Sequence, residues 1–134
     1  MSLTLTDQDK QTLRTAAYGA VSLLAAAGAA DSPHRIATQG SIALASATGP
    51  IGHVLAEKSK VVLKGKTTAA MADEVLPALT SAMTLLKKQD EDRAADFRST
   101  VLIALETAAR PTKGTPSPAV TDMIRKITEA LDAA

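Results

Sequence analysis

Sixteen consecutive residues, from Thr15 to Ala30, carry no charged side chain, and most of them are alanine or glycine. A helix that spans a membrane needs roughly 20 apolar residues, and this window has few large aliphatic side chains to drive insertion. The small residues before Asp31 suit a signal-peptide cleavage site, but the segment ahead of the window has two acids and two bases instead of a positive cluster. We therefore expect a buried helix in a soluble, cytoplasmic protein, and no association with a membrane.

The composition favours closely packed helices. Hydrophobic residues make up 46% of the 134-residue chain, but Tyr18 and Phe97 are the only aromatic ones. The core must therefore be built from Ala, Leu, Val, Ile and Met. A chain of this length is the size of one domain, so residues 1–134 are expected to form a single helical domain.

The uncharged window is predicted to lie in the first helix. Thr6 is a suitable N-cap, acids follow in the first turn, and Gly28 is a candidate left-handed stop, so we expect a helix over Asp7–Ala27. The later turns of this helix have no polar face. A helix that is apolar all round must be surrounded by others, so we expect it at the centre of the molecule.

Capping residues and apolar spacing predict the remaining helices. The fold class predicted is all-α, a compact bundle of about five to six helices. In the fourth helix, Pro77 removes a backbone hydrogen bond, and we expect a kink or a break near Val75–Leu76. The expected helices after the first are Pro33–Ala47, a short one from Pro50 to about residue 60 followed by an ordered loop, one from Thr67 or Thr68, Glu91–Ala109, and a last one from Pro118.

The second helix has small side chains at a spacing of four, at Ala37, Ser41 and Ala45. Such side chains let another helix approach closely. The first interpretation is packing against the first helix of the same chain. The alternative is a self-association face, with Ala37, Ser41 and Ala45 as its candidate residues.

The segment Gly49–Lys66 is the candidate for ligand binding. A Gly-Pro-Ile-Gly turn can present backbone N–H groups to an anion at a helix start, and residues 51–66 contain four lysines against one acid. His53 and Glu57 are one helical turn apart and would share a face. Two such groups are too few for a metal site, so we expect none. The candidate ligand-binding residues are His53, Glu57, Lys58 and Lys60, and a solvated loop is the alternative interpretation.

No catalytic motif is found in the sequence. A phosphate-binding loop, a dinucleotide-binding fingerprint and a recognisable catalytic triad are all missing, and without cysteine there is no thiolate chemistry. The net charge of +1 and the lack of aromatic stacking residues argue against nucleic-acid binding. We expect no catalytic residues, no cofactor and no enzymatic activity.

Four Ala- and Leu-rich strings carry a resemblance to known sequences: TLRTAAYGAVSLLAAAG, GHVLAEKSK, LPALTSAMTLLKKQ and FRSTVLIALETAAR. Together the chain resembles a group of small uncharacterised all-helical proteins of high-GC Gram-positive bacteria. The resemblance implies a cytoplasmic bacterial protein. It implies no activity and no site residues.

Two functions from different classes follow as expectations. The first is a non-enzymatic module that binds a protein partner or forms a homo-oligomer through its small-residue or aliphatic helix faces. The alternative is a domain that binds a small, anionic ligand with the Gly49–Lys66 segment.

Overall fold

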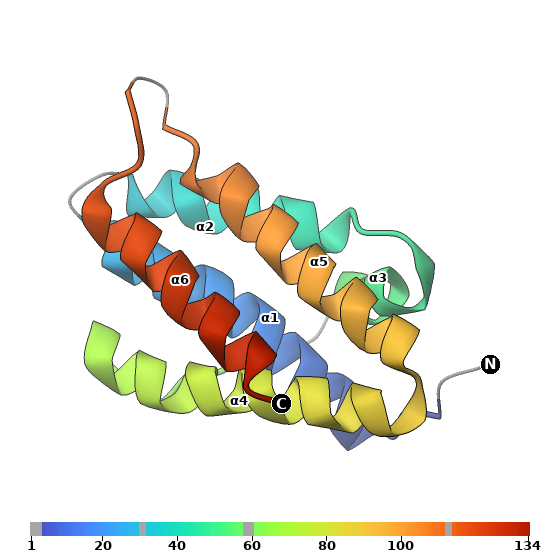
Figure 1. The fold of residues 1–134 in the computed structure, drawn as a ribbon. Helices are drawn as coiled ribbons and strands as arrows, with labels where there is room; N and C mark the ends of the chain where they lie inside the picture. Colours follow the sequence, from blue (N-terminus) through green and yellow to red (C-terminus); the bar gives the residue numbers. More distant parts are fainter. Residues whose placement is uncertain (1–3, 30–31, 58–60, 112–113) are drawn as a thin grey trace.

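The protein folds as a bundle of helices. The computed structural model describes residues 4–29, 32–57, 61–111 and 114–134, and these residues form six helices and no strand (Figure 1). The prediction of an all-α bundle is therefore confirmed. The helices are α1 (Asp7–Ala27), α2 (Pro33–Ala45), α3 (Gly49–Ala56), α4 (Thr68–Gln89), α5 (Glu91–Ala109) and α6 (Pro118–Asp132).

Helix α1 lies at the centre, as predicted, and contacts each of the other five helices. Figure 1 shows it passing between α4 on one side and α2 with α5 on the other, behind α6. Its middle turns are buried on nearly every side, which explains why they have no polar face. The buried residues of this stretch are Ala16, Ala17, Gly19, Ala20, Val21, Leu23, Leu24 and Ala25.

Glycines bring the neighbouring helices close to α1. A Cβ atom on Gly40 of α2 would lie 2.7 Å from a methyl group of Val21, and one on Gly19 of α1 would lie 2.9 Å from a methyl group of Val75 on α4. Real Cβ atoms do not approach so closely, so these contacts need glycine. The small residues of α1 and α2 thus serve packing within the chain.

The two ends of α1 differ in how well they were predicted. Thr6 is the N-cap, as predicted, and it forms a capping box with Asp9 through two hydrogen bonds of 3.0 Å. Gly28 follows the helix, but its φ of −91° is not left-handed, and that part of the prediction is wrong. A Cβ atom at this position would lie 2.5 Å from the terminal methyl group of Ile36, so the Ile36 side chain would have to move.

Helix α2 ends at Ala45, two residues before the predicted end at Ala47. The reason is the start of α3 close behind it. Thr48, the N-cap of α3, must adopt an extended backbone, with φ −106° and ψ 171°, and Gly49 follows with a φ of +79°. The chain therefore has to leave the helical conformation before these two residues.

Helix α4 runs without interruption from Thr68 to Gln89, so of the kink or break expected near Val75–Leu76, the break does not occur. Thr67 is its N-cap and accepts a hydrogen bond from the Ala70 N–H group. Pro77 is exposed, and so is Asp73, whose carbonyl group loses its helical partner. Because water can solvate this carbonyl, the proline is tolerated inside the helix.

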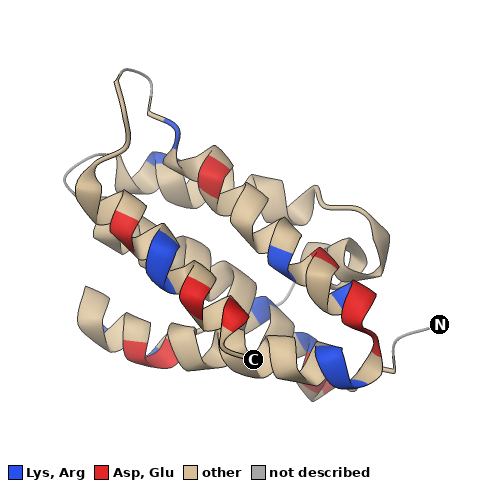
Figure 2. Ribbon diagram, viewed as in Figure 1, with Lys and Arg blue, Asp and Glu red and all other residues tan. Residues whose placement is uncertain are grey.

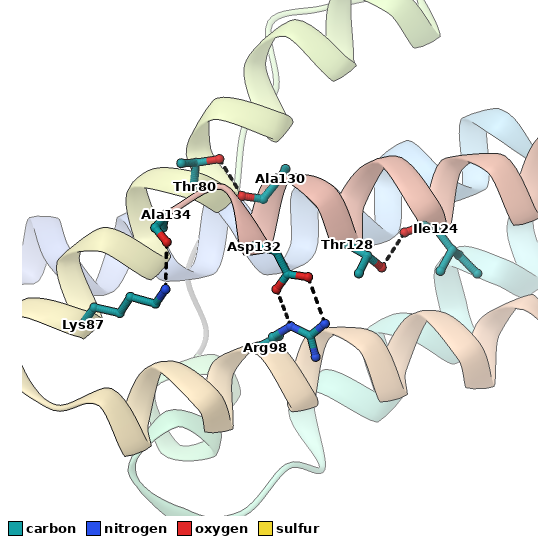
Figure 3. Close-up of polar contacts among 8 residues, drawn as sticks. All are labelled: Thr80, Lys87, Arg98, Ile124, Thr128, Ala130, Asp132 and Ala134. Carbon is teal, nitrogen blue, oxygen red and sulfur yellow. Dashed lines mark hydrogen bonds and ion pairs between the residues drawn. The ribbon is translucent and has the colours of Figure 1, made fainter.

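The C-terminal helix α6 is fastened to α4 and α5 by polar contacts near the chain end (Figure 3). The Thr80 hydroxyl donates to the Ala130 carbonyl at 2.7 Å, and the Lys87 ammonium donates to Ala134 at 2.8 Å. The Arg98 guanidinium binds the Asp132 carboxylate through two hydrogen bonds of 2.7 and 3.2 Å. These bonds hold the pKa of Asp132 below its usual range.

Arg14 is the only buried charged residue among those that the structure describes, and the outer face of α6 carries both signs (Figure 2). Asp122 and Lys126 form an i,i+4 ion pair, with 3.2 Å between the carboxylate and the ammonium group. Arg125 also binds Asp122 at 2.7 Å. Hydrogen bonds from Arg125 and then Lys126 lower the pKa of Asp122. α6 is therefore amphipathic, with its aliphatic side packed on the core.

Candidate functional site

A buried arginine of α1 fixes the end of α3. The last carbonyl groups of a helix have no partner within the helix and need one elsewhere. Arg14 is only 7% exposed, and its Nε donates to the Val54 carbonyl at 2.9 Å. A terminal nitrogen of the same guanidinium binds the Glu57 carboxylate. Arg14 thus satisfies an α3 carbonyl while its own charge is balanced.

Tyr18 lies one turn further along α1 and supports the same helix end. Its hydroxyl donates to the Leu55 carbonyl at 2.6 Å. Burial raises the pKa of Tyr18, and the nearby charge of Arg14 acts in the opposite direction. Together, Arg14 and Tyr18 hold two successive carbonyls of α3.

This arrangement explains a correction to the predicted helix end. α3 stops at Ala56, not near residue 60, and Glu57 is already extended, with φ −64° and ψ 133°. The extended backbone turns the Glu57 side chain back to Arg14. The early end of α3 therefore depends on residues some 40 positions away in the sequence.

His53 and Glu57 lie one turn apart, with 3.8 Å between His53 Nε2 and a Glu57 carboxylate oxygen. The His53 side chain is 81% exposed, and Glu57 is held by Arg14 from the other side. The two other candidate ligand-binding residues, Lys58 and Lys60, lie outside the described residues. The structure thus brings His53 and Glu57 together beside Arg14, a residue that the sequence did not single out.

An open groove of about 570 Å³ lies between α1, α2 and the end of α3. It joins the two regions that the sequence singled out separately: Ser41 and Ala45 come from the small-residue face, and Glu57 from the ligand-binding segment. Its floor and walls mix aliphatic side chains with hydroxyl groups. The lining residues are Tyr18, Ser22, Ser41, Ile42, Ala45, Ala56, Glu57, Val61 and Leu63.

Ala37, the third residue of the predicted self-association face, is not part of this lining. It is half-buried and packs against the core. Ile42 is a lining residue that the sequence did not single out. It is 54% exposed, because the helical spacing that buries Ile36 and Leu44 turns Ile42 outward.

A larger hollow of about 710 Å³ runs along α4. All of its lining residues belong to that one helix, so it has a single wall and encloses nothing. Its lining residues are Pro77, Thr80, Ser81, Thr84, Leu85, Lys88 and Gln89. We therefore take the groove beside α1 as the candidate site.

Two other kinds of site are absent from the described parts of the chain. Within residues 4–29, 32–57, 61–111 and 114–134, no group of three or more His, Asp or Glu residues is placed to hold a metal ion. None of the described helices combines the length and the apolar character required to cross a membrane.

Comparison with known proteins adds no assignment. No protein-family model, no curated protein and no solved structure matches this chain. The groove and its surroundings are therefore the features of the molecule that bear on its function.

Proposed function

We propose that this protein is a non-enzymatic, cytoplasmic helical module that binds a protein partner in the groove beside α1, and that this partner is a second copy of the chain. The observation that supports it best is the exposure of Ile42 on the groove's rim, where 54% of its surface is open to water. A single exposed aliphatic residue is ordinary on a protein surface. This one adjoins a hollow lined by further apolar side chains, which is how a binding surface is built.

A second exposed aliphatic residue adjoins the same groove. Val62 is 62% exposed and lies between Val61 and Leu63, both of which line the groove. The small side chains of Ser41 and Ala45 leave room for a helix from outside to approach α2. The projecting Ile42 and the groove share one face of the molecule. Two copies related by a twofold axis can therefore each insert Ile42 into the groove of the other.

Sedimentation velocity over a range of protein concentrations tests this proposal. We expect wild type to associate as concentration rises, and Ile42→Lys to remain monomeric because it places a charge in the contact. Ile103→Lys is the matched control, since Ile103 is 60% exposed on α5 and does not line this groove. Circular dichroism checks that both variants fold.

Three results count against the proposal. Wild type that stays monomeric at every concentration contradicts self-association. An oligomer that survives Ile42→Lys contradicts the use of this groove, and loss of the oligomer in both variants shows that the effect is not specific to it.

A small-ligand site is the second candidate, because 570 Å³ is within the range of roughly 300–1,000 Å³ typical of ligand pockets. Glu57 lines the groove, and the charge of Arg14 is already balanced by Glu57, so a neutral or cationic amphiphile fits better than the anion expected from the sequence. A ligand that binds only the folded state raises the melting temperature. Thermal-shift measurements with inorganic phosphate and with alkylamines therefore show whether the groove binds an anion or a cationic amphiphile.

A further inference from the structure

One wall of the groove is formed by residues Val61–Lys66, which we call the strap. The strap precedes α4 and has neither helix nor strand structure, and its residues alternate between half-buried and exposed. Val61 and Leu63 face inward and line the groove. Leu63 also covers α1, since a Cβ atom on Gly19 would lie 3.7 Å from its methyl group. The strap thus completes the groove and shields part of α1.

A single carboxylate holds the strap on α4. Glu74 accepts a hydrogen bond from the Lys64 N–H group at 3.1 Å with one oxygen, and another from the Gly65 N–H group with the second. The backbone of Val61, Val62 and Leu63 forms no hydrogen bond with any other described residue. Glu74 is therefore the only hydrogen-bonding tether of the strap within the described chain.

Gly65 allows the strap to come close enough for this tether. A Cβ atom at that position would lie 2.6 Å from the backbone of Ala70 in the first turn of α4. Backbone atoms cannot move aside as the end of a side chain can, so only glycine fits. The close approach brings two neighbouring N–H groups to one carboxylate, an arrangement in which each hydrogen bond is strengthened by the charge.

We propose that Glu74 latches the strap, and that the groove is complete only while this latch is closed. With the latch open, Val61 and Leu63 leave the groove, and the half-buried Tyr18 becomes more accessible to water. The latch then controls binding of the second copy in the groove, and this part of the inference rests on the proposed function. The opening of the strap itself does not depend on it.

Amide hydrogen exchange followed by NMR tests the latch directly. Glu74→Ala should accelerate exchange at Lys64 and Gly65 roughly tenfold or more, because both amides lose a hydrogen bond to an ionised acceptor. Glu74→Gln, which keeps one acceptor oxygen, should have a smaller effect. Asp73→Ala is the matched control: it removes the neighbouring exposed acid of α4 and should leave both amides unchanged.

Tyr18 provides an independent measurement, because it is the only tyrosine in a chain without tryptophan. Its ionisation, followed by ultraviolet absorbance, reports on this groove alone. Burial is the main cause of the raised pKa of Tyr18. Opening the strap should therefore lower this pKa toward its ordinary value of 10.0 in Glu74→Ala but not in Asp73→Ala.

The outcomes separate the latch from the proposed function. If Glu74→Ala changes neither the exchange at Lys64 and Gly65 nor the titration of Tyr18, the latch does not exist. If both change and self-association is unaffected, the latch exists but does not control binding. If both change while wild type never associates, the latch stands and the proposed function alone is wrong. Weaker association in Glu74→Ala together with both changes supports the whole proposal.

Discussion

Arg14 and Tyr18 show how much of this site depends on contacts between residues far apart in the chain. In the sequence, Arg14 marks only the charged side of the uncharged window, and Tyr18 is one of two aromatic residues. Their partners, Val54 and Leu55, are 40 and 37 residues away. No local pattern predicts such pairs. The sequence therefore led to His53 and Glu57, which share a helix face, but not to the two residues that position them.

Tyr18→Phe tests the role of this hydroxyl. At neutral pH we expect it to lower the free energy of unfolding by about 1 kcal/mol, the usual contribution of one hydrogen bond. Burial raises the pKa of Tyr18, so the folded state favours the neutral phenol. The stability that the neutral Tyr18 phenol contributes is fully present below pH 10.0, and it is lost as the pH rises through the pKa of Tyr18 in the folded state.

The difference in stability between wild type and Tyr18→Phe should therefore narrow above pH 10.0. Urea unfolding of both proteins at neutral pH and at several alkaline pH values measures this difference in the free energy of unfolding. A difference that stays constant over this range would show that the hydroxyl is not buried in the folded state.

At the level of the helices, prediction succeeded where the signals are local. The bounds of α1 and α5 agree with those read from the sequence, because capping residues, helix spacing and Pro111 lie within or beside these elements. The end of α3 was misplaced, since it is set by Arg14 on another helix. Pro77 did not break α4, because its exposed position lets water replace the lost partner. These errors occur where solvent exposure or a distant residue decides the local structure.

Gly40→Ala tests whether close packing, more than helix propensity, selects the small residues of α2. Alanine favours helix by about 1 kcal/mol over glycine. The added Cβ atom, however, would lie 2.7 and 2.9 Å from the two methyl groups of Val21, a β-branched side chain with little freedom to rotate. Overpacking of this kind costs about 1–3 kcal/mol. We therefore expect a net loss of stability in chemical denaturation.

Thr38→Ala is the matched control on the same helix. Thr38 is exposed, so the substitution gains helix propensity without a clash and should stabilise the protein slightly. If Gly40→Ala stabilises the protein as Thr38→Ala does, α2 does not pack against α1 as closely as the structure indicates.

At the scale of the whole molecule, one helix organises the fold and supports the groove. α1 supplies the centre of the core through its uncharged turns and contributes the half-buried Tyr18 and Ser22 of the same turns to the groove. Its central place could be predicted because a helix without a polar face has to be surrounded. The groove could not, since it forms where α1, α2, α3 and the strap meet, and the sequence does not show which surfaces meet. Binding at the groove would thus act on the central helix of the bundle.

The central position of α1 is tested most directly by native-state hydrogen exchange of its amides from Ala16 to Ala25. If all other helices pack around this segment, its amides can exchange only when the whole molecule unfolds. The free energy of opening measured there should equal the global free energy of unfolding from denaturant titration, while the amides of α3 open at lower cost. Exchange of residues 16–25 at a free energy well below the global value would contradict the account.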